Sequence, residues 1–212
     1  MEKVEMISRA CEFLLSKRSC RNVTMDEVAS DLGISKRTLY ENFENKGQLI
    51  LECMEFMHNN IFDKCNKIES KCENAFDFFM SIVSLMWSIS GEIFTFTSEL
   101  KRVYPEIYKQ VLTSHIQFAR AKVNQFLVNA KKEGFVKKDI DEEFFLNLIE
   151  LNMIYSSHPD FLKKNSKYTE KELKFKLLCT IMRGISSVEG VQYMDNKVDK
   201  WNKIIKNNLY RL

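Results

Sequence analysis

Residues 33–49, GISKRTLYENFENKGQL, gather side chains that could bind a nucleic acid. Lys36 and Arg37 are adjacent, and no acidic residue lies between Leu32 and Tyr40. Cationic and hydroxyl side chains donate hydrogen bonds to phosphates and to base edges. The same residue types also occur on the solvent-exposed face of an ordinary helix, so the spacing of the neighbouring residues must decide between the two interpretations.

The spacing predicts two short helices joined by a tight turn. Thr24 lies three residues before Glu27, and in this capping-box pattern each side chain binds the other residue's free backbone N–H. Gly33 suits the left-handed end of the first helix, and Ser35 can cap a second helix over 36–43. The pair forms a helix-turn-helix pattern, and a preceding helix over 2–17 supplies the third face of a small core.

The rest of the chain also favours helices. Of the 212 residues only 6 are Gly and 2 are Pro, so few residues would break a helix. The predicted helices cover 46–69, 74–90, 93–104, 106–133, 141–157, 169–186 and 196–209. The expected fold class is all-α, with an N-terminal three-helix helix-turn-helix DNA-binding domain over 1–47 and a larger helical ligand-binding and dimerisation domain over 48–212.

Composition argues against several other classes of protein. Hydrophobic residues make up 45% and charged residues 29% of the chain, as in globular proteins. No apolar run approaches the ~20 residues of a membrane span, and the acidic N-terminus does not suit a signal peptide, so we expect a cytoplasmic protein. The six cysteines form no CxxC pair, and we expect reduced structural thiols, with a redox sensor as the alternative, and no metal. No nucleophile–base constellation or cofactor loop is present, so neither enzymatic activity nor a cofactor is expected.

The segment VTMDEVASDLGISKRTLYENFENKGQLI, within residues 4–53, resembles the DNA-binding signature of the tetracycline-repressor (TetR) family of bacterial transcriptional regulators. The later segments YPEIY, EGFVKKDID and MRGISSVEG resemble helix junctions of the family's ligand domains more loosely. Three positions depart from the family pattern. Arg37 stands where a small residue is common, Asn42 where His or Tyr is common, and Ser19 where a turn glycine is common.

The resemblance implies that the helix over 36–43 enters the major groove of double-stranded DNA. Lys36, Arg37 and Asn42 are then expected to read bases. The alternative for Lys36 and Arg37 is that both are solvent-exposed side chains without a DNA contact. Tyr40 and Lys46 match family residues that bind phosphate. The full set of expected DNA contacts is Thr24, Ser35, Lys36, Arg37, Thr38, Tyr40, Asn42 and Lys46.

Aromatic residues and methionines concentrate after residue 50, with 16 Phe in the whole chain. Each one alone is typical of a packed core, but together they suit an apolar cavity among helices, and the resemblance implies such a ligand pocket. Glu99, His115 and Gln117 are possible polar groups for orienting a ligand. The expected pocket residues are Phe79, Met86, Trp87, Phe94, Phe96, Tyr104 and Phe118.

Two late helices are too apolar for exposed surfaces. Two such helices from each subunit could pack as a four-helix bundle, and a two-fold dimer matches a palindromic operator. The expected interface residues are Phe145, Leu148, Tyr155, Leu177, Ile181, Gly184 and Ile185.

The resulting hypothesis is a homodimeric TetR-like repressor that binds a palindromic operator. A small apolar or amphipathic effector molecule, which the sequence does not identify, would release it from the DNA. The alternative is a dimeric DNA-binding regulator that a protein partner controls, or one with no physiological small ligand. No membrane partner is expected.

Overall fold

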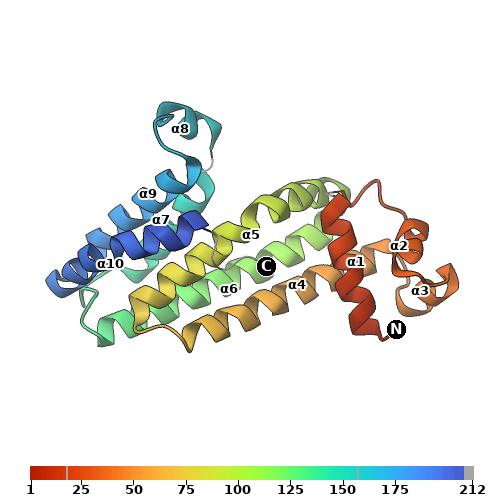
Figure 1. Cartoon of the computed structure of the whole chain (residues 1–212), viewed down its shortest axis with the longest axis horizontal. Coiled ribbons are helices and arrows are strands. Elements are labelled where there is room, and N and C mark those ends of the chain that lie inside the picture. The colour runs from red at the N-terminus through yellow and green to blue at the C-terminus, as the bar shows by residue number, and fades with distance from the viewer. Residues whose placement is uncertain (18, 157, 208–212) are drawn as a thin grey trace. The chain divides into compact units, whose positions relative to one another are not determined.

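The computed structural model describes the backbone of residues 1–17, 19–156 and 158–207, and the side chains of these residues outside 89–95, 153–154 and 204–207. The all-α prediction is confirmed. Figure 1 labels the helices. They are α1 (Lys3–Lys17), α2 (Met25–Leu32), α3 (Lys36–Asn42), α4 (Lys46–Glu69), α5 (Ala75–Val103), α6 (Pro105–Lys132), α7 (Glu142–Tyr155), α8 (Pro159–Lys164), α9 (Glu170–Ile185) and α10 (Val188–Asn207).

The chain divides into two compact units that share three helices. The first unit comprises Met1–Lys67 and Ile89–Phe118, and the second comprises Ile68–Ser88 and the residues from Ala119 onward. α4, α5 and α6 therefore each contribute to both units. The expected division at 47/48 is a functional one, between DNA binding and the rest of the chain, and it stays a prediction.

In the first unit, α1 packs against α2 and α2 against α3. Ala10 and Leu14 of α1 are fully buried, and so is Leu49 near the start of α4. Farther along α4, the His58 ring lies 5.4 Å from the Phe118 ring of α6. Apolar side chains thus run continuously from the helix-turn-helix segment along α4.

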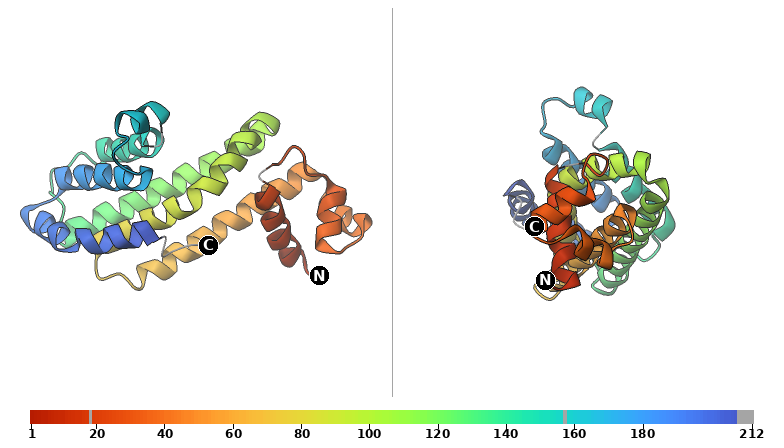
Figure 2. Two further views of the ribbon diagram at one scale, coloured as in Figure 1. Left: turned by 45° about the horizontal axis from the view of Figure 1, so that its top comes forward. Right: turned by 90° about the vertical axis from the view of Figure 1, so that its right-hand side faces the viewer.

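The second unit has an aromatic core. Phe79 of α5 stacks on Phe126 of α6 with ring centroids 4.4 Å apart, and α9 packs against α7 and α10; Figure 2 shows α9 and α10 from two further sides. Asp77 of α5 is buried and accepts hydrogen bonds from Trp201 Nε1 (2.7 Å) and Tyr193 Oη (2.9 Å). Because a buried carboxylate needs such partners, these bonds fix α10 on α5.

One predicted break and one predicted helix start are wrong, and one helix was not predicted. The predicted break between 90 and 93 does not exist, since α5 runs without interruption from Ala75 to Val103. Gly91 lies inside this helix and is not among the glycines with positive φ; an interior glycine costs only about 1 kcal/mol, too little to end a long helix. The short helix α8 was not predicted, and α10 begins at Val188 rather than at 196.

No helix in the described part of the chain combines the length and the apolar character that crossing a bilayer requires.

Candidate nucleic-acid interface

The two helices of the helix-turn-helix segment begin at the predicted residues, and the second ends at Asn42, one residue before the predicted end. Thr24 Oγ1 accepts the Glu27 N–H (3.2 Å) while Glu27 Oε2 accepts the Thr24 N–H (2.7 Å). Gly33 has φ 68° and ψ 31°, the left-handed conformation that glycine adopts at least cost. Ser35 Oγ then accepts the Thr38 N–H at 3.0 Å. Local side chains therefore satisfy the backbone groups that two such short helices leave free.

One face of α3 is buried and the opposite face is open to solvent. Leu39 and Phe43 are 0% and 1% exposed, as the sequence predicted. Lys36, Arg37 and Tyr40 are exposed. Because Leu39 and Phe43 fix the rotation of α3 about its axis, the three polar side chains are presented outward together.

Both cations at the start of α3 have an acidic partner. Lys36 Nζ lies 2.7 Å from Asp26 Oδ1, and Arg37 Nε lies 2.9 Å from Glu41 Oε1. The hydrogen bond and the charge of Asp26 raise the pKa of Lys36. The Arg37 side chain is 89% exposed, and exposed pairs of this kind contribute only ~0–1 kcal/mol. Either cation can therefore exchange its carboxylate for a phosphate or a base at little cost.

Two other side chains of α3 that were expected to contact DNA already form hydrogen bonds within the protein. The Thr38 N–H and hydroxyl both bind Ser35 Oγ. Asn42 Nδ2 donates to the Thr38 carbonyl at 2.9 Å, so this amide folds back on its own helix. The Tyr40 side chain is 45% exposed and presents its ring at the surface.

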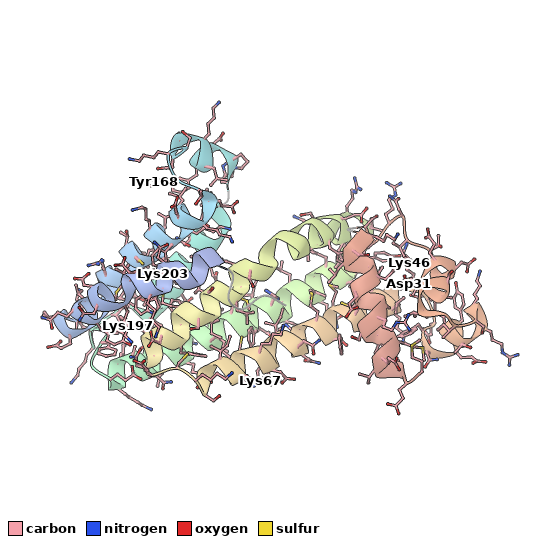
Figure 3. All side chains as sticks on the ribbon, in the orientation of Figure 1. Asp31, Lys46, Lys67, Tyr168, Lys197 and Lys203 are labelled. Carbon is pink, nitrogen blue, oxygen red and sulfur yellow. The ribbon has the colours of Figure 1, made fainter. Side chains whose placement is uncertain are left out.

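Lys46 binds the loop between α1 and α2. Its Nζ donates to the carbonyl oxygens of Arg21 (3.0 Å) and Val23, and Figure 3 labels the residue. In the protein alone this ammonium therefore holds the loop that leads into α2. An ammonium has three N–H donors, so one remains for a phosphate.

Glu99, from the last turns of α5, binds the same loop. Its carboxylate accepts the Cys20 N–H at 2.5 Å, the Arg21 N–H at 3.4 Å and the Ser19 hydroxyl at 3.1 Å. Partial burial alone would raise the pKa of Glu99, but these hydrogen bonds outweigh it and lower the pKa below the usual glutamate value. Sequence reasoning had offered Glu99 as a ligand-orienting residue. With about 80 residues between Glu99 and the loop, no local pattern could reveal the contact.

Comparison with known proteins adds independent evidence for this architecture. The sequence model of the bacterial regulatory proteins of the tetR family matches residues 7–53, which span α1 to the first turns of α4. Residues 7–53 therefore carry the sequence of the TetR family.

Two solved structures share this fold at low sequence identity, and one curated protein matches part of the sequence. A transcriptional regulator from Cytophaga hutchinsonii superposes with a TM-score of 0.66 at 18% identity, covering 87% of this chain and 99% of the other. Reduced NemR from E. coli superposes with a TM-score of 0.66 at 14% identity, covering 88% of this chain and 98% of the other. The nucleoid occlusion factor SlmA of Aliivibrio fischeri is 28% identical over 64 residues, or 30% of this chain. The match spans about a third (33%) of the length of this curated relative.

The aromatic residues expected to line a ligand pocket fall in both units of this chain. Phe96 is fully buried in the first unit, where Tyr104 and Phe118 are half-buried. Phe79 is buried in the core of the second unit, and Met86 and Trp87 are half-buried there. The Phe94 side chain lies outside the described residues. The pocket stays a prediction.

The residues expected at a dimer interface occupy two environments. Phe145 and Ile185 are 1% and 8% exposed and belong to the core of this chain. Tyr155 is 56% exposed, Gly184 is exposed, and the remaining three, Leu148, Leu177 and Ile181, are half-buried. Two more apolar side chains of α7, Phe144 (60%) and Leu151 (50%), are exposed and were not among the expected interface residues.

The Glu99 contact generates a prediction about the loop. In Glu99→Gln, the Cys20 and Arg21 amides should exchange hydrogen about 5- to 10-fold faster at pH 7, because a hydrogen bond to a neutral amide is weaker than one to a carboxylate. The lowered pKa fixes the pH dependence. The contribution of Glu99 is complete above the ordinary glutamate pKa of about 4.3 and is lost as the pH falls through the lower folded-state pKa.

Residue-resolved hydrogen exchange by NMR measures this effect, with Glu55→Gln as the control because Glu55 is exposed on α4 of the same unit. Equal exchange in wild type and Glu99→Gln at pH 7 would show that the carboxylate does not hold the loop.

Proposed function

We propose that this chain is a TetR-family transcriptional repressor that binds a palindromic DNA operator as a homodimer. The observation that carries the proposal is α3 itself, whose buried side is fixed by Leu39 and Phe43 while Lys36, Arg37 and Tyr40 face solvent together. A helix of this kind can enter the major groove, where each base pair presents a distinct set of donors and acceptors.

The side chains of α3 and the start of α4 divide into those that would read bases and those that would position the protein on the DNA backbone. Arg37 can donate two hydrogen bonds to a guanine edge, and Lys36 can bind a guanine or a phosphate. Tyr40 and the free N–H of Lys46 suit phosphate contacts, which fix register without reading sequence. Ser35 already caps α3, and a helix N-terminus favours an adjacent phosphate.

Dimerisation through α7 and α9 is supported by an exposed apolar row. Phe144, Leu151 and Tyr155 follow one another at spacings of seven and four, which places them on one face of α7. On α9, Gly184 is exposed, and a Cβ added there would meet no atom within 4 Å. Another helix can approach such an open glycine closely, and an apolar row of this kind is typical of an interface.

Release from DNA by a small apolar or amphipathic ligand is the regulatory part of the proposal. α4 begins with Lys46 on the loop before α2 and continues into the second unit, and α5 carries Glu99 to the same loop. A ligand that shifts either helix would move the start of α2. It can do so only if it binds the two conformations with different affinity. The alternative is control by a protein partner, or no physiological small ligand.

DNA binding is tested with Arg37→Ala. Loss of a bidentate base contact should weaken binding to the selected operator about 5- to 150-fold, the equivalent of 1–3 kcal/mol. Affinity for unrelated DNA should fall far less. Electrophoretic shift on duplexes selected from a random-sequence library measures both affinities over a range of salt concentrations.

Arg102→Ala serves as the matched control, because Arg102 is an exposed arginine of α5 outside the helix-turn-helix segment. Absence of any salt-sensitive, sequence-selective shift in the wild type, with Arg37→Ala behaving identically, would refute DNA recognition by α3.

Dimerisation is tested with Leu151→Glu. A charge at the centre of the exposed apolar row should convert the dimer to a monomer at micromolar concentration, since an unpaired carboxylate is costly to bury. Val128→Glu is the control, because Val128 is an apolar residue of α6 with a similar exposure, 48% against 50% for Leu151. Sedimentation equilibrium that gives one mass for wild type and Leu151→Glu would contradict this interface.

Ligand control is tested by thermal shift against a panel of metabolites and drugs. A genuine ligand stabilises the protein in proportion to the logarithm of its concentration over its dissociation constant. The same compound should release the operator duplex in the shift assay. A panel that yields stabilisation without release, or neither effect, would favour the alternative of control by a protein partner.

A further inference from the structure

A groove of about 770 Å³ lies in the second unit, apart from every residue assigned above to DNA binding. Residues of α9 and α10 line it, together with Lys167 and Tyr168, which precede α9 in the chain. Figure 3 labels Tyr168 near α8 and α9. Its volume falls within the ~300–1,000 Å³ that is usual for small-molecule sites.

The groove and the proposed dimer interface use different faces of α9. Lys176, Thr180 and Arg183 line the groove and follow one another at spacings of four and three, so they form one strip along the helix. The expected interface residues Leu177, Ile181 and Gly184 each stand one position later, which is about 100° around the helix axis. A dimer formed through that second strip would leave the groove open.

The charge of the groove is positive. Three cationic side chains line it and one acidic side chain, Glu172, opposes them. The Glu172 carboxylate accepts the N–H and the hydroxyl of Thr169, each at 3.0 Å, in the capping box of α9. Since Glu172 is held at the helix start, it neutralises the rest of the groove only in part.

Two of the cations flank one aromatic ring. Lys167 Nζ lies 5.0 Å and Lys176 Nζ 5.1 Å from the centroid of the Tyr168 ring. Within the described ranges neither ammonium forms an ion pair with a carboxylate. Arg183, farther along the groove, pairs with the exposed Asp195. Two ammonium groups held near one ring repel each other, and an anion bound beside them would relieve that repulsion.

The floor of the groove is apolar. Phe175 and Cys179 are 6% and 8% exposed, and Val198 is half-buried. Burial raises the pKa of the Cys179 thiol to about 11, so this side chain is neutral at pH 7 and contributes no negative charge. The floor can therefore receive an apolar body while the lysines face its polar end.

We propose that this groove binds a small organic anion, with a flat apolar body on Phe175, Cys179 and Tyr168 and a carboxylate or sulfonate group beside Lys167 and Lys176. The site is separate from the expected aromatic pocket, which shares none of its residues. The proposal stands independently of DNA binding and of the dimer.

The probe is 8-anilinonaphthalene-1-sulfonate, an aromatic sulfonate whose fluorescence rises on binding, and N-phenyl-1-naphthylamine is its uncharged counterpart. The Lys167→Gln/Lys176→Gln double variant should bind the sulfonate about 5- to 10-fold more weakly, as expected for two lost charge contacts. It should bind the neutral amine as the wild type does. Thr180→Trp should weaken both probes by filling the groove, and Lys138→Gln, an exposed lysine outside it, should change neither.

Circular dichroism checks that each variant is folded. An unchanged affinity for the sulfonate in the double variant would overturn the proposal. So would an equal loss for both probes in that variant, because the lysines would then shape the groove rather than select charge. Unaltered binding in Thr180→Trp would place the probe elsewhere and would likewise overturn it.

Discussion

The hydrogen bonds that Glu99 and Lys46 make to the loop between α1 and α2 fix the position at which α2 begins. The carboxylate accepts two backbone N–H groups of this loop and the ammonium donates to two of its carbonyls. α2 and α3 are only eight and seven residues long, and helices this short do not persist alone in water. Their orientation therefore depends on α1, on α4 and on the end of α5.

Much of the fold could be predicted because the sequence marks helix ends with local chemistry. Thr24 and Thr169 each begin a helix with a capping box, and Gly33 ends one; such signals act over three or four residues and are visible in one pass. The failures have different causes, and at α10 a local signal was overlooked, since Ser187 Oγ caps this helix by accepting the Gly190 N–H at 3.0 Å. The break predicted between 90 and 93 is absent because α5 continues through it, and α8 begins at Pro159 with no side-chain cap.

The candidate site was predictable in its residue types but not in their partners. Spacing placed Leu39 and Phe43 inside, and therefore Lys36 and Arg37 outside. The i,i+4 spacing of Arg37 and Glu41 is compatible with an ion pair on one helix. Periodicity could not show that Asp26 of α2 holds Lys36, because that pair forms between two helices. The bonds of Glu99 to the loop were not predicted for a different reason, since a contact across about 80 residues exists only after the helices have packed.

The acidic partners of Lys36 and Arg37 bear on how α3 could discriminate between DNA sequences. A phosphate or a base edge must displace the carboxylate before it can bind Lys36 or Arg37. The net free energy of each DNA contact is therefore reduced by that of the ion pair it replaces. Exposed pairs are worth at most ~1 kcal/mol, whereas a bidentate contact to the correct base is worth ~1–3 kcal/mol. After the ion pair is subtracted, a single phosphate contact would keep little net free energy, whereas a bidentate base contact would keep most of its own. The pairs would therefore weaken nonspecific binding by a larger fraction than operator binding.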